Sequence, residues 1–126
     1  MTWFKVEDNF WSHPKVMHLS SHAAGVWLRS AAYCSAHLTD GRITGHTIEV
    51  ICPESRAHTR RAIAELVTAV LWDLGTQGDE YVFHDWAVYQ STRAEVEAKR
   101  EAEREKKARQ RRNAAGKYAP VPEGQT

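Results

Sequence analysis

The chain has 126 residues, a formal net charge of +1 at pH 7 and 26% charged side chains. This length is typical of one domain. The two cysteines, Cys34 and Cys52, exclude a disulfide framework and favour free thiols in a reducing compartment. The apolar runs are far shorter than the ~20 residues of a membrane span, and the first residues do not resemble a signal peptide. We therefore expect a soluble, cytoplasmic protein with no membrane partner.

The charge is unevenly distributed along the chain. Residues 1–92 contain seven Lys or Arg and ten Asp or Glu, which gives −3, whereas residues 93–117 contain ten and five, which gives +5. Large apolar side chains are frequent up to residue 89, and after that only Val96 precedes Tyr118. This pattern predicts a folded domain over residues 1–91 and a net-basic tail, and it suggests a polyanionic partner for the tail.

The first half of the chain predicts two short strands and three helices. Residues 3–6 are expected to form a short strand, and Pro14 favours a short helix over residues 13–19. A longer helix should run from Ser20 or Ser21 to about residue 37, with an inward stripe of Ala24, Trp27, Leu28, Ala31 and Leu38. Residues 42–43 leave room for a minimal strand, after which Thr44 should cap a short helix through residue 51.

The next segment predicts a helix followed by a β-hairpin. Ser55 should cap a helix over residues 56–71, whose inward positions are Ile63, Leu66, Val67, Val70 and Leu71. Residues 71–74 and 81–84 are β-prone runs joined by a glycine-containing polar loop, which is typical of a hairpin. The order of helix, strand, helix, tight turn, helix and hairpin predicts an α+β, mainly helical fold: a winged helix-turn-helix over residues 1–91.

The tail predicts a charged helical extension. Thr92 and Glu95 form a capping-box pattern, and residues 93–113 consist almost entirely of strong helix formers. The segment has no apolar stripe, which excludes a coiled-coil seam. We expect a charged basic helix over residues 92–113 and a flexible end over residues 114–126.

In a winged helix, the third helix enters the major groove, so its outward N-terminal half is the candidate DNA-reading surface. The candidate residues are Arg56, His58, Thr59, Arg60 and Arg61 on this helix, Thr76 and Gln77 at the hairpin tip, and Arg100, Arg104, Lys106, Lys107, Arg109, Arg111 and Arg112 in the tail. The acidic pair Asp79 and Glu80 in the hairpin should be repelled by phosphate. The alternative is that these arginines belong to a solvated helix face.

The sequence gives little reason to expect catalysis, a cofactor or a metal. His18 and His22 are four residues apart and Cys34 and His37 three apart, but no second pair follows at zinc-finger spacing. A glycine-rich phosphate loop, a nucleophile elbow and a zinc-protease motif are all missing from the sequence. We expect no enzyme, and we expect Trp27, Trp72, Trp86 and Phe83 to serve as core residues.

The order of short motifs resembles that of small proteins from actinobacterial phages and mobile elements. The motifs are WFKVED at 3–8, SHPKV at 12–16, AGVW at 24–27, LTDG at 38–41, LW at 71–72, FHDW at 83–86, YQ at 89–90 and STRAEV at 91–96. These proteins are similar to the winged-helix N-terminal domain of DnaD-type replisome organisers and phage replication initiators. The resemblance implies binding of double-stranded DNA in replication or transcription control, in a bacterial host cytoplasm. It also implies self-association or recruitment of a replication or transcription protein. The rival hypothesis is a phage protein-interaction module that does not bind DNA.

Overall fold

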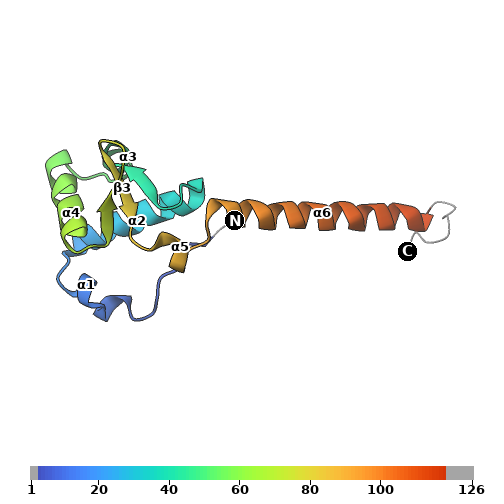
Figure 1. Cartoon of the computed structure of the whole chain (residues 1–126), viewed down its shortest axis with the longest axis horizontal. Coiled ribbons are helices and arrows are strands. Elements are labelled where there is room, and N and C mark those ends of the chain that lie inside the picture. Colours follow the sequence, from blue (N-terminus) through green and yellow to red (C-terminus); the bar gives the residue numbers. More distant parts are fainter. Residues whose placement is uncertain (1–2, 119–126) are drawn as a thin grey trace. The chain divides into compact units, whose positions relative to one another are not determined.

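The computed structural model describes residues 3–118, and residues 1–2 and 119–126 lie outside the description. The chain divides into two compact units, Met1–Arg93 and Ala94–Thr126. The first unit contains a 3₁₀ turn η1 (Phe10–Ser12), five helices and a small sheet, in the order shown in Figure 1. The helices are α1 (Pro14–Met17), α2 (Ser21–His37), α3 (Gly45–Ile51), α4 (Arg56–Thr68) and α5 (Trp86–Tyr89). The strands are β1 (Arg42–Thr44), β2 (Trp72–Leu74) and β3 (Glu80–Phe83).

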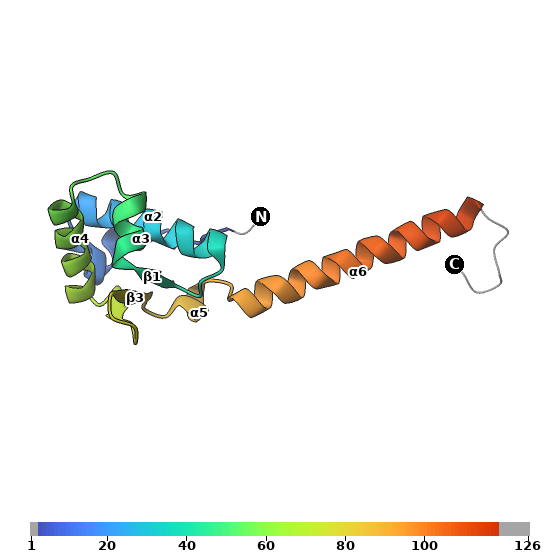
Figure 2. The same cartoon turned by 90° about the horizontal axis from the view of Figure 1, so that it is seen from above.

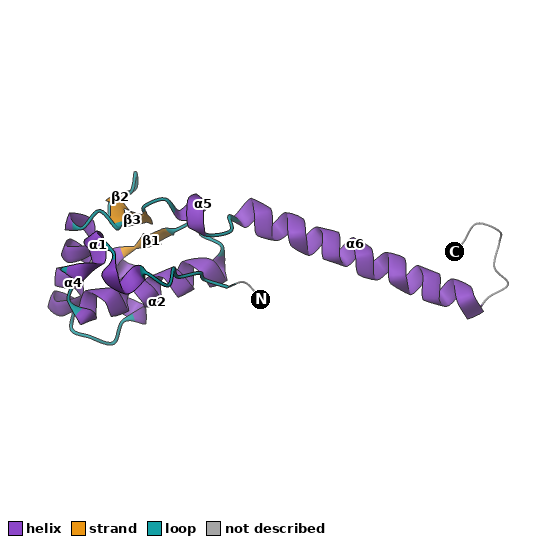
Figure 3. Cartoon of the chain, turned by 90° about the horizontal axis from the view of Figure 1, so that it is seen from below, coloured by secondary structure: helices purple, strands orange, loops and turns teal. Residues whose placement is uncertain are grey.

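The three strands form one antiparallel sheet in the order β1-β3-β2. Ile43 pairs with Tyr81, and Trp72 pairs with Phe83. Figures 2 and 3 show this sheet on one side of α2, α3 and α4. The described chain is therefore α+β and mostly helical, as predicted, and the minimal strand and the hairpin are both present.

Side-chain hydrogen bonds define the starts of the main helices. The hydroxyl of Ser20 accepts from Ala23 N in α2, that of Thr44 from Thr47 N in α3, and that of Ser55 from His58 N in α4. These three caps agree with the predictions, because a cap depends on residues only a few positions apart. The cap of α1 is different: the Nδ1 atom of His13 accepts from Lys15 N at 3.1 Å.

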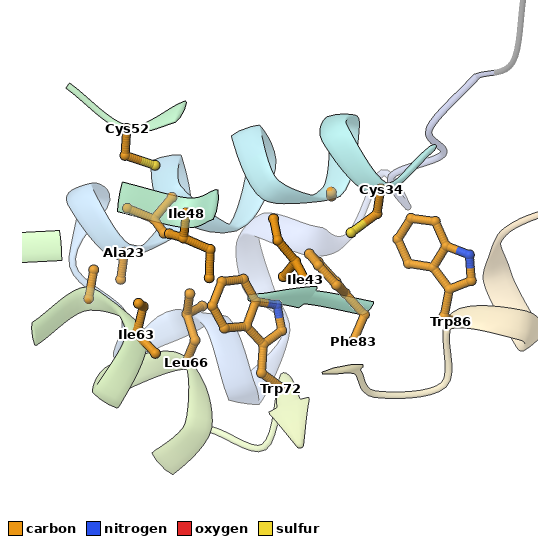
Figure 4. Packing of buried hydrophobic residues seen from close by; sticks show 13 residues of the cluster. Ala23, Cys34, Ile43, Ile48, Cys52, Ile63, Leu66, Trp72, Phe83 and Trp86 are labelled. Carbon is orange, nitrogen blue, oxygen red and sulfur yellow. The ribbon is translucent and has the colours of Figure 1, made fainter. Parts of the chain in front are cut away.

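The core lies between α2, α3, α4 and the sheet. Ile48, Leu66 and Trp72 are almost completely buried there, and Phe83 lies between Trp72 and Trp86 with ring centroids 5.3 and 5.2 Å apart. Figure 4 shows these side chains pointing toward one another from α3, α4, the hairpin and α5. The prediction that the central tryptophans and Phe83 belong to the core is confirmed for Trp72, Phe83 and Trp86, and Trp27 packs partly buried against them.

The predicted inward stripe of α2 is confirmed at Ala31 and wrong at Leu28, and its other members, Ala24, Trp27 and Leu38, are partly buried. The buried residues are Ala23, Val26, Ser30, Ala31 and Cys34, whereas Leu28 is 50% exposed. Several of the buried side chains are small, which allows neighbouring elements to approach α2 closely. The rings of Phe4 and Phe10 lie against Trp27.

The expected strand at residues 3–6 does not form. This segment lacks a β-partner in the structure, and its backbone is instead held by one side chain: Lys5 N donates to Gln90 Oε1 at 2.9 Å, and Gln90 Nε2 donates to Lys5 O at 2.6 Å. The predicted helix over residues 13–19 shortens to α1 (Pro14–Met17).

Helix α4 ends three residues earlier than predicted. Val70 N donates to Val67 O and Leu71 N donates to Leu66 O, the bonding pattern of a Schellman motif. The motif requires one residue in the left-handed conformation, and Val70 adopts this conformation with φ 59°. Glycine usually takes this position, so a valine gives no sequence signal of a helix end.

The second unit is the remainder of one long helix, α6 (Arg93–Tyr118). The helical tail is confirmed, but it extends beyond residue 113, so residues 114–118 are not part of a flexible end. Residues 119–126 of that predicted end lie outside the described chain. Within α6, the ion pair between Glu101 and Arg104 joins residues three positions apart.

Candidate nucleic-acid interface

The exposed face of α4 presents an arginine among small side chains. Ala57, Arg61, Ala64 and Thr68 follow one another at three- and four-residue steps and are all exposed. We call these four residues the α4 stripe. Within residues 3–118, the Arg61 side chain has no hydrogen bond or ion pair. It is therefore available to a partner, and the neighbouring alanines allow that partner to approach the helix closely.

Arg60, the neighbour of Arg61, is held in an ion-pair network. Its Nε donates to Glu49 Oε1 at 2.6 Å, and its two terminal nitrogens donate to the two Asp79 oxygens at 2.8 and 3.1 Å. Arg56 Nε lies 3.2 Å from the same Glu49 oxygen, although its side chain is 80% exposed. The hydrogen bonds from Arg60 keep the pKa of Glu49 and the pKa of Asp79 below their ordinary values. Arg60 is therefore already engaged by the protein itself.

The network ties the hairpin loop to α3 and α4. Asp79 belongs to the loop between β2 and β3, and its carbonyl oxygen accepts from Gly45 N at 2.8 Å, at the start of α3. A Cβ atom at position 45 would lie 2.6 Å from Arg60 Nη1 and 2.6 Å from Asp79 Oδ2. A glycine at this position permits the backbone contact and the ion pair to coexist.

The two acidic side chains Asp79 and Glu80 of the hairpin are each paired with an arginine. Asp79 is paired with Arg60, and Glu80 is paired with Arg42 at 3.0 Å. The predicted hairpin-tip residues Thr76 and Gln77 are both exposed. The loop therefore presents neutral polar side chains at its tip, while its carboxylates are bonded to arginines of the same domain.

The prediction that Thr59 contacts DNA does not fit its position. Its side chain is completely buried, because it belongs to the same inward face of α4 as Ala62, Ile63 and Leu66. A side chain in this position cannot reach a phosphate or a base edge. His58 is exposed at the start of α4, and its ring lies against that of His22 with centroids 3.9 Å apart. The predicted cluster thus splits into exposed, paired and buried members.

The basic residues predicted for the tail all lie on α6. Arg100, Arg104, Lys106, Lys107, Arg109, Arg111 and Arg112 are each exposed, and Arg104 is paired with Glu101. Their charges form a dense basic segment of the kind that attracts a polyanion.

The structure brings no metal-binding group together among residues 3–118. Cys34 is buried in the core, where burial raises the pKa of its thiol to about 11. A thiol in this state is unreactive at neutral pH. In the same described part of the chain, no helix is long and apolar enough to cross a membrane.

The fold and the α4 stripe define an α+β domain with an exposed helix face. The chain matches no protein-family model, no curated protein and no solved structure.

Sequence reasoning missed the network that separates Arg60 from Arg61. Glu49 and Asp79 lie 11 and 19 residues away from Arg60 in the chain. Adjacent arginines on a helix look equivalent in a sequence, and only the packing of α3 and the hairpin loop against α4 distinguishes them.

Proposed function

We propose that this chain is a winged helix-turn-helix protein that binds double-stranded DNA and performs no catalysis. The observation that carries the proposal is the α4 stripe: an unpaired Arg61 between two alanines, on the helix that precedes the hairpin. An arginine can donate two hydrogen bonds to guanine O6 and N7 in the major groove, and an alanine methyl can contact the methyl group of thymine. The hairpin of β2 and β3 takes the place of the wing.

In this proposal, α4 and α6 have different tasks. The folded unit is net acidic, so its α4 stripe supplies sequence preference rather than overall attraction. The basic side chains of α6 neutralise phosphates and supply most of the affinity through release of counterions. Such a protein would act in replication initiation, replisome organisation or transcription control, in a bacterial cytoplasm when it is encoded by a phage.

The test compares matched arginine variants for binding to duplex DNA selected from a random pool. Arg61→Ala should weaken the selected site by about 1–3 kcal/mol and relax its sequence preference, as expected for loss of a base contact. Arg60→Ala removes the same charge but no available donor, so the preference should remain. If both variants lose affinity equally for all sequences, Arg61 is a phosphate contact and not a base contact.

A second set of variants tests the tail within the full chain. Replacing Lys106, Lys107, Arg109, Arg111 and Arg112 by glutamine removes positive charge while keeping strong helix formers. The dependence of affinity on salt should become shallower by about 0.9 per lost phosphate contact. If the unsubstituted chain does not bind any duplex at low salt, DNA binding is refuted.

A cavity beside α5 favours a second candidate function, protein interaction. Its volume is about 410 Å³, and Phe4, Phe10 and Trp27 line it together with Trp86. Four further lining residues, Val6, Val70, Val88 and Tyr89, are 46–72% exposed. Exposed apolar side chains around a cavity are typical of a docking surface. This candidate is favoured if the unsubstituted chain binds a protein partner but no DNA, and if the Tyr89→Asp variant no longer binds that partner.

A further inference from the structure

A groove lies between α1 and α4, next to the α4 stripe. Its volume is about 440 Å³, and its lining includes Lys15 and His18 from the α1 side and Arg61 and Thr68 from the α4 side. Arg61, Ala64 and Thr68 therefore belong both to the stripe and to the groove. One lysine, one arginine and one histidine side chain therefore line the same groove, and they come from two different sides of it.

Local structure fixes the position of Lys15. Pro14 starts α1, and the His13 ring caps it by accepting from Lys15 N at 3.1 Å. The Lys15 ammonium lies 3.4 Å from the carbonyl oxygen of Val70, just beyond the end of α4. A lysine has three donors, so this contact leaves donors for a further acceptor.

The groove also contains one carboxylate, which is already bonded. Glu65 Oε1 accepts from Ser20 N at 3.0 Å, and Glu65 Oε2 accepts from the Ser20 hydroxyl at 2.7 Å. These bonds direct both oxygens toward the start of α2. Lys15 and Arg61 are cationic donors, and the His18 ring and the Thr68 hydroxyl can each donate as well as accept. The two cations outnumber the one carboxylate, so this set of side chains favours an anion.

We infer that this groove holds a backbone phosphate of duplex DNA while the α4 stripe lies in the major groove. The inference rests on the proposed function. The major groove is about 12 Å wide and a helix with its side chains is about 10–12 Å across, so the sugar–phosphate strands run along both sides of an inserted helix. An element packed beside the helix therefore meets a phosphate. On the α1 side that element presents Lys15 and His18.

The division of roles follows from this geometry. Lys15 lies in the groove and outside the stripe, so it binds phosphate without reading sequence. Arg61 lies at the junction and contributes to both. Phosphate contacts position a protein on DNA, and base contacts select the site.

The experiment measures binding of the full chain to a 20-base-pair duplex across a salt series. Lys15→Gln should reduce the salt slope by about 0.9, so that the loss of affinity between about 50 and about 200 mM salt becomes about 3.5-fold smaller. The ranking of duplex sequences should stay the same. Lys15→Arg should retain the slope, and Lys5→Gln, which removes an equal charge outside the groove, should leave it unchanged.

Each outcome decides the inference. If the unsubstituted chain binds duplex and Lys15→Gln has the same slope as Lys5→Gln, the phosphate groove is refuted while DNA binding stands. If the unsubstituted chain does not bind duplex even at low salt, both proposals fail. If the slope falls in Lys15→Gln and Lys15→Arg alike, a positive charge is insufficient and the groove is not a phosphate site. Tryptophan fluorescence melts of each variant identify any loss of folding.

Discussion

Replacing Thr59 by valine should stabilise the folded unit. Thr59 is completely buried, and its hydroxyl has no hydrogen-bond partner among residues 3–118. A buried hydroxyl without a partner costs about 1–3 kcal/mol, and valine has nearly the same shape and a similar helix propensity. Thr59→Val should therefore raise the free energy of unfolding by about 1–3 kcal/mol. For a domain of this size, that corresponds to an increase in Tm of at least about 4 °C.

The assay is thermal unfolding followed by tryptophan fluorescence, because Trp72 and Trp86 lie in the core. Thr68→Val is the matched control: Thr68 is exposed near the end of the same helix, so its stability should change by less than about 0.5 kcal/mol. Duplex binding by Thr59→Val should equal that of the unsubstituted chain. A fall in Tm would mean that the Thr59 hydroxyl has a hydrogen-bond partner, such as an internal water. A tenfold loss of DNA affinity would mean that Thr59 does contribute to the DNA interface.

Three further predictions follow from particular residues. Val70→Gly should raise the free energy of unfolding, measured by urea titration, by about 1 kcal/mol, because Val70 adopts the left-handed φ of 59° and is already 46% exposed. A loss of stability would mean that the backbone at Val70 is not strained. Burial raises the pKa of the Cys34 thiol to about 11, so at pH 8 Cys34 should react with a thiol reagent only as fast as the domain opens. Stoichiometric labelling within seconds would contradict its burial. The lowered pKa values of Glu49 and Asp79 mean that their bonds to Arg60 stabilise fully above their ordinary values of 4.5 and 3.8, and that stability is lost as pH falls through the lowered values. An Arg60→Met variant should lose that pH dependence of the unfolding midpoint, and an unchanged dependence would place its origin elsewhere.

The sequence was sufficient where short-range bonds decide the structure. Thr44 and Ser55 start α3 and α4 through bonds to residues three positions ahead, so the pattern of neighbours is enough. Two β-prone runs joined by a glycine-containing polar loop likewise predict the hairpin of β2 and β3. The pairing of β1 with β3, which completes the sheet, joins strands separated by α3, α4 and β2, and the sequence analysis did not predict it.

Long-range packing decided the features that the sequence could not predict. The end of α4 depends on a left-handed Val70, which the local sequence does not favour. The inward face of α2 includes the buried Ala23 and Ser30, whereas the pattern alone favours the larger Leu28. Within the candidate interface, the different states of Thr59, Arg60 and Arg61 depend on how α3 and the hairpin loop pack against α4.

The net charge of the folded unit does not describe the field at the α4 stripe. Residues 1–92 carry seven Lys or Arg and ten Asp or Glu, a balance of −3 that predicts weak attraction to DNA. Three carboxylates near α4 are, however, locally compensated: Arg60 bonds Glu49 and Asp79, and Arg42 bonds Glu80. Glu65, on α4 itself, is hydrogen-bonded to Ser20 and keeps its negative charge. Interactions with more distant charges are screened within about 8–10 Å at ordinary ionic strength. At the stripe, an approaching phosphate is therefore attracted by Arg61 and repelled mainly by Glu65, because the other three nearby carboxylates are paired with arginines. Removing Arg60 would weaken DNA binding indirectly, by exposing two carboxylates, rather than by removing a contact.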